Sequence, residues 1–171
     1  MNGRVLGVDP GTARMGYAVV HQDNDHLRLL TCGVLETSSV LPLQDRLAIL
    51  YAGLTRIIDE WQPTELAIED LFFNRNVRSA LSVGQARGVA LLAAAHRGLA
   101  VCNYTPLQVK ESVTGFGRAR KEQIQEMARV LLNLDSVPQP DDAADAAALA
   151  ICHLNSAAGR EVLRQLSKRT T

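Results

Sequence analysis

The sequence contains few of the residues on which several classes of protein depend. Aromatic side chains make up only 4% of the 171 residues, and the three cysteines, Cys32, Cys102 and Cys152, are far apart. An odd, scattered set of cysteines indicates neither a disulfide framework nor a zinc site, so buried thiols are expected. No apolar run reaches the length of a transmembrane helix. The first residues lack the architecture of a signal peptide, which favours a cytoplasmic protein.

Net charge is also absent, since 18 basic and 18 acidic side chains cancel. The distribution is more informative. Residues 1–73 carry 5 basic and 10 acidic side chains, 74–129 carry 9 and 3, and 130–171 carry 4 and 5. A basic middle between acidic flanks fits a phosphate-binding surface beside a carboxylate cluster. An unevenly charged solvent-exposed surface is the alternative explanation.

Hydrophobic periodicity predicts an α/β fold. Strands are expected near residues 4–9, 15–21, 27–36, 65–70 and 99–104, and helices near 43–61, 78–97, 106–113, 121–134 and 141–155. Short connections make the first three strands antiparallel neighbours, and a helical crossover places the fourth strand beside the first. We expect a mixed five-stranded sheet with helices on both faces, in one domain over residues 1–157 followed by a polar tail, 158–171.

Two of the expected strands end in a carboxylate. Asp9 follows an apolar β-branched run and precedes Pro10 and Gly11. A carboxylate at the end of a buried strand is unfavourable unless its charge is compensated, and Mg²⁺ or Mn²⁺ would compensate it. The alternative is that Asp9 only caps the turn. Glu69 ends the fourth strand, so the two carboxylates lie at the same sheet edge if these strands are parallel neighbours.

The last expected helix opens with three more acidic residues. At 100° per residue, Asp142 and Asp145 are about 60° apart around the helix, and Asp141 and Asp145 are about 40° apart. Periodicity therefore does not choose between Asp141 and Asp142. Asp145 lies among alanines on the face expected to pack on the sheet, where it needs a partner. For Asp141, interaction with the helix dipole is a sufficient explanation.

The helix expected over residues 78–97 is rich in alanine and contains Gly84 and Gly88. Each glycine is less favourable than alanine by roughly 1 kcal/mol inside a helix, so close packing is the simplest reason for both. Burial between the sheet and a second subunit is one such arrangement, and burial within a monomer is the other.

Five motifs follow one another over about residues 3–157. They are Gly7-Val8-Asp9-Pro10-Gly11-Thr12, Ala67-Ile68-Glu69 with Phe72, Gly84-Gln85-Ala86-Arg87-Gly88, Gln108-Val109-Lys110 and Asp142-Ala143-Ala144-Asp145-Ala146. In type and order, these motifs resemble those of the RuvC Holliday junction resolvases of bacteria. The resemblance implies a ribonuclease-H-like fold, a homodimer, metal-dependent cleavage of four-way DNA junctions in recombination and repair, and partnership with the RuvA–RuvB branch-migration complex.

The resemblance also implies roles for single residues. It makes Asp9, Glu69, Asp142 and Asp145 the ligands of two Mg²⁺ ions per subunit, with Mn²⁺ as an alternative ion. Lys110 and Lys121 match lysines near the scissile DNA and complete the catalytic set. Phe72 matches an aromatic that stacks at the junction crossover, and the adjacent Phe73 fits the same role. Further candidate DNA contacts are Asn74, Arg75, Arg78, Arg118 and Arg120.

Two other functions share some of these features. Proteins of the actin, Hsp70 and sugar-kinase type open with a similar Asp-x-Gly-Thr hairpin, but they need a second phosphate-binding hairpin and a second lobe, for which 171 residues leave no room. A non-catalytic DNA-binding module with the same fold is the other alternative. Four carboxylates without a metal would repel DNA, which argues against that module.

Overall fold

The computed structural model describes residues 3–24, 26–70 and 77–156. All ten predicted elements are present, and all except one begin and end within two residues of their expected bounds. The strands are β1 (Gly3–Asp9), β2 (Arg14–Asp23), β3 (His26–Glu36), β4 (Glu65–Glu69) and β5 (Ala100–Tyr104). The helices are α1 (Leu43–Trp61), α2 (Val77–His96), α3 (Pro106–Thr114), α4 (Lys121–Leu131) and α5 (Asp141–Asn155).

The end of α4 is where the sequence prediction was wrong. The helix was expected to reach Leu134, but it stops at Leu131. Asn133 adopts a positive φ of 52°, a left-handed conformation that asparagine tolerates better than most residues. The carbonyl of Leu134 then accepts a hydrogen bond from the Arg129 guanidinium at 2.8 Å, which holds the turned chain against the helix.

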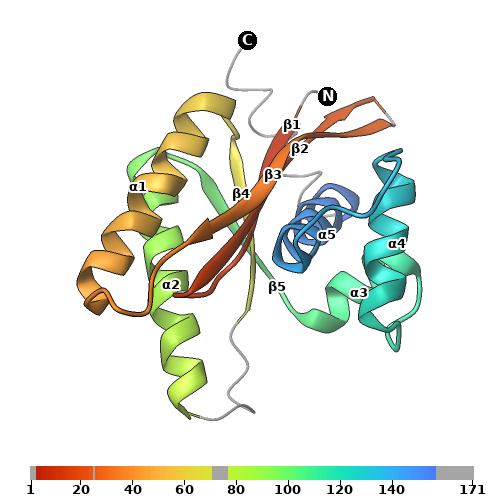
Figure 1. Cartoon of the computed structure of the whole chain (residues 1–171). Coiled ribbons are helices and arrows are strands. Elements are labelled where there is room, and N and C mark those ends of the chain that lie inside the picture. The colour runs from red at the N-terminus through yellow and green to blue at the C-terminus, as the bar shows by residue number, and fades with distance from the viewer. Residues whose placement is uncertain (1–2, 25, 71–76, 157–171) are drawn as a thin grey trace.

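The five strands form one mixed sheet in the order β3-β2-β1-β4-β5. β1 pairs antiparallel with β2, and β2 pairs antiparallel with β3. β1 and β4 are parallel, as are β4 and β5. The predicted adjacency of the first and fourth strands is therefore confirmed, and the carboxyl ends of β1 and β4 lie at the same sheet edge (Figure 1).

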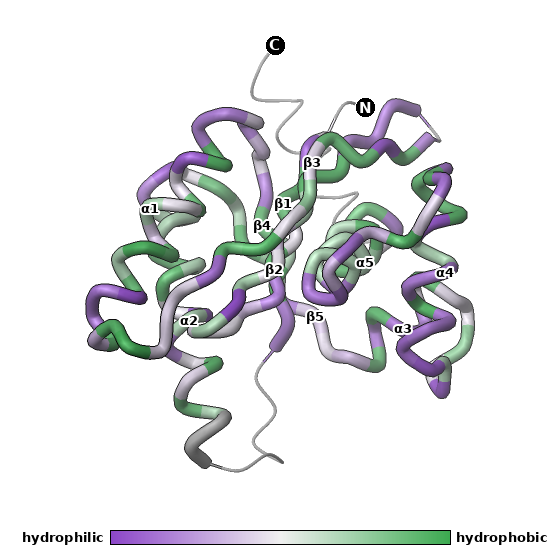
Figure 2. The backbone as a smooth tube through the Cα atoms, in the orientation of Figure 1, coloured by the Kyte–Doolittle hydropathy of each residue, from purple (hydrophilic) through white to green (hydrophobic). Residues whose placement is uncertain are grey.

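Helices cover both faces of this sheet (Figure 1). α1 and α2 pack on one face over a core that includes Leu6, Met15 and Ile68. α5 packs on the other face, with α3 and α4 outside it, so α5 has neighbours on both sides. Hydrophobic residues accordingly concentrate where α5 meets the sheet, while the hydrophilic segments of α3 and α4 lie outermost (Figure 2).

Two glycines let α5 approach the sheet very closely. A Cβ atom on Gly7 of β1 would lie 2.0 Å from the carbonyl oxygen of Ala146, and one on Gly16 of β2 would lie 2.0 Å from that of Asp142. Both neighbours are helix backbone, which cannot rotate away. The predicted alanine-rich face of α5 thus packs on a glycine-containing sheet surface, and the first turn of α5 is held directly above β2.

A buried polar network joins the other half of α5 to the sheet. His153 and Glu65 are both fully buried, and Nε2 of His153 lies 2.5 Å from Oε2 of Glu65. Nδ1 of His153 lies 2.7 Å from the hydroxyl of Tyr104. Burial alone would lower the pKa of His153, but hydrogen bonds with Cys102 and Glu65 raise it to about 9.

Within the described residues, no helix is both long enough and apolar enough to cross a lipid bilayer.

Candidate active site

Asp9 and Glu69 end two neighbouring parallel strands. Val8 of β1 is in register with Ile68 of β4, so the residues that follow them lie side by side at the carboxyl edge of the sheet. Both acidic side chains are half-buried. Among the described residues, no hydrogen bond joins the Asp9 carboxylate to the backbone of the following turn, so turn capping does not account for this residue.

α5 brings two further carboxylates to the same edge. Asp142 lies in its first turn directly over Gly16, and Gly16 is the β2 partner of Asp9 in the sheet register. Asp145 follows one turn later. The side chain of Asp142 is 31% exposed, whereas that of Asp141 is 62% exposed. Helical periodicity did not choose between Asp141 and Asp142 as a metal ligand. The packing of α5 favours Asp142.

The pKa of Asp9 is raised by burial and by the negative charges around it. Burial and the charges of Asp145, Glu69 and Asp142, in that order, raise it from 3.8 to about 7. Lys121 acts in the opposite direction. All four sequence-predicted carboxylates are therefore close enough to interact electrostatically, and Asp141 does not contribute to the shift. A group of this kind favours a cation because the added positive charge relieves the repulsion.

Two basic side chains form ion pairs with the α5 carboxylates. Nζ of Lys121, the first residue of α4, lies 2.8 Å from Oδ2 of Asp145 and 3.5 Å from Oδ2 of Asp141. The hydrogen bond to Asp145 raises the pKa of Lys121. Nη2 of Arg14 in β2 lies 3.2 Å from Oδ2 of Asp142. These partners fix the carboxylate orientations and partly neutralise their charge.

Sequence reasoning missed Arg14 and Gln125. Nε2 of Gln125 donates to Oδ1 of Asp145 at 3.5 Å, one helical turn after Lys121. The spacing of Lys121 and Gln125 on one helix face was a usable signal once Asp145 was suspected. No sequence pattern links Arg14 to Asp142, because that contact depends on how α5 lies across β2.

A third basic residue supports the ends of β4 and β5. Nε of Arg87 in α2 donates to the backbone carbonyl of Glu69 at 3.3 Å. Its Nη2 donates to the side chain of Asn103 in β5 and lies 3.9 Å from Asp70. Arg87 therefore positions the strand end that carries Glu69 without contacting the Glu69 carboxylate through these bonds.

The remaining predicted residues lie at varying distances from this cluster. Lys110 is half-buried on α3, which packs against α5, and it forms no ion pair with the four carboxylates in the described part of the chain. Arg118 and Arg120 are exposed in the segment before α4. Phe72, Phe73, Asn74 and Arg75 lie outside the described residues, as does the side chain of Arg78.

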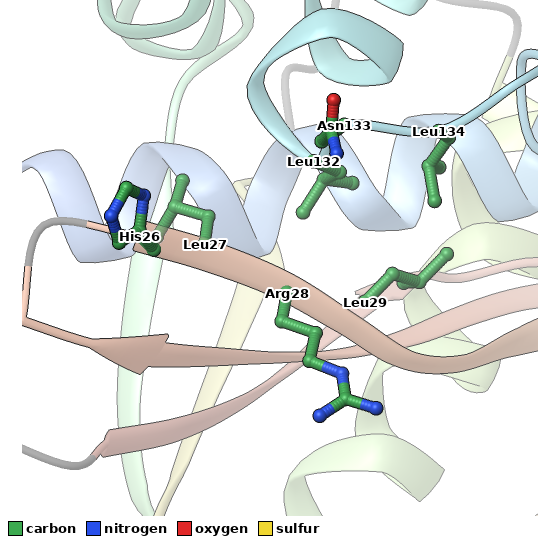
Figure 3. A pocket seen from close by; sticks show the side chains of 7 residues that line it. All are labelled: His26, Leu27, Arg28, Leu29, Leu132, Asn133 and Leu134. Carbon is green, nitrogen blue, oxygen red and sulfur yellow. The ribbon is translucent and has the colours of Figure 1, made fainter.

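A pocket of about 470 Å³ lies elsewhere on the protein (Figure 3). It is formed where the start of β3 meets the chain after α4, and none of the predicted site residues lines it. Its residues are His26, Leu27, Arg28, Leu29, Leu132, Asn133 and Leu134.

The carboxylate cluster fits divalent cations by its donor set. Four carboxylates supply the oxygen ligands that Mg²⁺ and Mn²⁺ prefer, and no histidine or cysteine is among them. Burial raises the pKa of Asp9 most, and the charges of Asp145, Glu69 and Asp142 raise it further against the opposing effect of Lys121. A bound cation would supply the missing positive charge.

Comparisons with known proteins identify the family of this chain. The family model described as "Crossover junction endodeoxyribonuclease RuvC" matches residues 5–153. A protein of that name from Roseiflexus sp. is 53% identical over 154 residues, which cover 90% of this chain and 92% of the relative. One from Rubrobacter xylanophilus is 54% identical over 149 residues, or 87% of this chain and 83% of the relative.

Solved structures give the same result. RuvC of Thermus thermophilus in complex with Holliday junction substrate superposes with a TM-score of 0.86 at 36% identity, covering 91% of this chain and 95% of the other. The yeast mitochondrial Holliday junction resolvase Ydc2 has a TM-score of 0.68 at 16% identity, a likeness of fold alone. With a ribonuclease-H-like sheet, a matching family model and relatives aligned over most of its length, the chain belongs to the RuvC family of crossover junction endodeoxyribonucleases.

Proposed function

We propose that this protein resolves four-way DNA junctions by metal-dependent hydrolysis of phosphodiester bonds, with Asp9, Glu69, Asp142 and Asp145 as its metal ligands. The observation that carries the proposal is the convergence of these carboxylates at one edge of the sheet, where burial and then the charges of the other three raise the pKa of Asp9. Family membership supplies the substrate class, since the solved relative from Thermus thermophilus is bound to a Holliday junction.

The four carboxylates would hold two Mg²⁺ ions, with Mn²⁺ as the alternative. A pair of divalent ions held there would supply an activated water and stabilisation of the leaving oxygen. The chain's own contribution is orientation: Gly16 fixes the backbone of Asp142, while Arg14 and Lys121 aim the carboxylates of α5. Arg87 holds the end of β4 so that Glu69 faces the same space.

Basic residues beside the cluster would bind the DNA. Lys121 already lies at the cluster, where it can exchange its contact with Asp145 for a phosphate oxygen. Lys110, Arg118 and Arg120 extend the positive charge over α3 and the segment before α4. Phe116 in that segment is 57% exposed and offers an apolar surface next to them. Phe72 or Phe73 is proposed to stack at the junction crossover, with Asn74, Arg75 and Arg78 as backbone contacts.

The test is cleavage of a synthetic four-way junction by the purified protein, with and without Mg²⁺, beside an ATPase assay. We expect metal-dependent, paired nicks in the junction, little cleavage of linear duplex and no ATP hydrolysis. ATP hydrolysis without junction cleavage would favour the kinase-like alternative. Tight junction binding without cleavage in either Mg²⁺ or Mn²⁺ would favour the non-catalytic module.

The two lysines are expected to act mainly on the chemical step. Lys110→Ala and Lys121→Ala should each lower the single-turnover cleavage rate by about 10²-fold at saturating protein, because each removes a positive charge that stabilises the phosphate in the transition state. Arg118→Ala is the matched control: it should weaken binding and reduce the salt slope by about one, with a normal rate at saturation. If saturating protein restores the wild-type rate of the lysine variants, both lysines only position DNA.

Two symmetric nicks require two active sites, so the protein is proposed to act as a homodimer through α2. An apolar stripe runs along the outer face of α2. It includes Leu81 and Leu92, which lie on the same side of the helix and are 62% and 49% exposed. Gly88 is exposed on the same stripe. A two-fold interface is self-complementary, so this one stripe would serve both subunits.

Gly88→Leu should break that dimer while leaving each chain folded. A Cβ atom at Gly88 meets nothing within 4 Å in the single chain, so the larger side chain has room in a monomer and none in a close helix–helix contact. Light scattering at micromolar concentration should show monomers that bind junctions weakly and make uncoordinated nicks. Gly88→Ala is the control that keeps the dimer. A Gly88→Leu variant that stays dimeric would place the interface elsewhere.

Two parts of the proposal rest on the family alone. One is a partnership with the RuvA–RuvB branch-migration complex, and the other is a cytoplasmic location, where bacterial chromosomal DNA lies. Residues 158–171 are proposed to be a polar tail outside the catalytic domain.

A further inference from the structure

Three different metal-binding side chains converge on the α5 face of the sheet, away from the carboxylate cluster. Glu65 begins β4, Cys102 lies in β5, and His153 lies in the last turns of α5. A carboxylate oxygen, the sulfur and an imidazole nitrogen all lie within 4.8 Å of one another. Glu65 and Glu69 are four residues apart on one strand face, so about 13 Å of strand separates this group from the candidate active site.

The contact between His153 and Glu65 needs a proton or a metal ion between its two atoms. Nε2 lies 2.5 Å from Oε2, and both atoms can present lone pairs. The Tyr104 hydroxyl, 2.7 Å from Nδ1, can accept the proton of that nitrogen and is 3.1 Å from the Ser156 hydroxyl. When Nδ1 donates to this hydroxyl, Nε2 faces Glu65 and can hold a proton or a metal ion there, and metal-ligating histidines have an outer partner of the same kind.

The second carboxylate oxygen of Glu65 also favours a bound cation. Oε1 is fully buried and has no hydrogen-bond partner in the described part of the chain. An acceptor left unpaired in the interior is unfavourable, and a buried carboxylate more so. Among the described residues, this carboxylate oxygen therefore has no hydrogen-bond partner, although it belongs to a group of three side chains that can bind a metal.

We propose that Glu65, Cys102 and His153 bind one Zn²⁺ ion that ties α5 to β4 and β5. Zinc accepts oxygen, sulfur and nitrogen ligands together, and both oxygens of Glu65 would complete four donor atoms. Bond lengths of about 2.0–2.3 Å place ligand atoms from different residues about 3.3–3.6 Å apart, so shifts of roughly 1 Å suffice. Binding displaces the thiol proton of Cys102 and the proton between His153 and Glu65 into solvent.

Sequence analysis predicted no zinc site because the three ligands are 37 and 51 positions apart and follow no spacing motif. The fold alone brings them together: Glu65 and Cys102 lie on neighbouring strands, since Cys102 is in register with Ala67. Such a site would be structural, because it is closed by the core around α5. It does not depend on the proposed nuclease activity.

Cobalt spectroscopy of the full-length protein tests the proposal. The metal-stripped, reduced protein is titrated with Co²⁺ in excess Mg²⁺, which keeps the carboxylate cluster occupied. We expect a near-ultraviolet thiolate-to-cobalt absorption band that saturates at one ion per chain and disappears when Zn²⁺ is added. Zn²⁺ should also raise the Tm by about 5–10 °C when it is well above its dissociation constant. A carboxylate-only site cannot produce the thiolate band.

Two single substitutions make the result specific. Cys102→Ser should abolish both the band and the zinc-dependent rise in Tm, whereas Cys32→Ser, which changes another half-buried cysteine, should retain both. The proposal is overturned if the wild-type protein gives no thiolate band, or if Cys102→Ser gives the same band. If Cys102→Ser does not fold, retention of the band in both Cys32→Ser and Cys152→Ser assigns it to Cys102, and its loss in either overturns the assignment.

Discussion

Asp9→Asn is expected to abolish junction cleavage while making the metal-free protein more stable. Asn keeps the size of the side chain but removes the charge that a divalent cation needs, so the cleavage rate should fall by at least about 10³-fold. Glu69→Gln, Asp142→Asn and Asp145→Asn should have the same effect on cleavage. Junction binding should remain largely intact in all four variants, because the basic residues that contact phosphate are unchanged.

The opposite effect on stability follows from the pKa of Asp9. The folded protein raises this pKa from 3.8 to about 7, so folding takes up a proton between these values. Without metal, ionisation of Asp9 is less favourable in the folded protein than in the unfolded chain. The contribution of Asp9 to the free energy of unfolding is therefore highest below about pH 4 and falls as the pH rises toward 7. Above pH 7 in chelator, Asp9→Asn should be more stable than wild type by on the order of 2–4 kcal/mol.

Cleavage assays, band shifts and chemical denaturation on the same preparations would check this pair of effects. Asp141→Asn is the matched control, since this carboxylate is more exposed and does not contribute to the pKa of Asp9. It should cleave at near the wild-type rate. Loss of cleavage in Asp141→Asn together with normal cleavage in Asp142→Asn would show that the wrong neighbour had been chosen, and normal cleavage in Asp145→Asn would refute the four-ligand arrangement.

Gly16→Ala is expected to destabilise the protein by about 3 kcal/mol or more and to remove activity with it. The new methyl group would lie 2.0 Å from the carbonyl oxygen of Asp142 and 2.9 Å from its Cβ. Overpacking against side chains typically costs 1–3 kcal/mol, and here the obstacle is helix backbone. The first turn of α5 must lift from β2, which carries Asp142 away from Asp9.

Gly33→Ala provides the control for a glycine in the same sheet. The atoms nearest to its added methyl group would belong to the end of the Tyr17 side chain, with the hydroxyl oxygen at 2.8 Å, and that end can move. We expect a loss of less than about 1 kcal/mol and normal cleavage. Urea denaturation and the Mg²⁺ concentration for half-maximal cleavage would be measured for both. Equal stability of Gly16→Ala and wild type would mean that α5 is not held by this contact.

The strands and helices could be predicted because their patterns are local. Apolar runs ending at Asp9 and Glu69, and the periodic alanines of α5, determine element type and order. The sheet order then follows from connection lengths, so the meeting of Asp9 and Glu69 was predictable without coordinates. The end of α4 was not, because the left-handed conformation of Asn133 depends on the contact between Arg129 and the carbonyl of Leu134.

The details of the site depended on contacts between distant elements. The choice between Asp141 and Asp142 depends on which of them lies over Gly16, a distance of one residue along a helix. The pairing of Arg14 with Asp142 likewise arises only when α5 crosses β2. Helical periodicity describes one helix in isolation, so it carries no information about either contact.

The burial of α5 between the sheet and the outer helices has a consequence for how the protein opens. All residues of α5 from Ala146 to Leu154 are buried, and its neighbours lie on both sides. Amide hydrogens in such a helix exchange with solvent chiefly through global unfolding, since no local opening can expose them. Two of the four candidate ligands lie on this helix. A chain that opens only in part would therefore keep α5 on the sheet, and Asp142 and Asp145 would leave the site only when the whole domain unfolds.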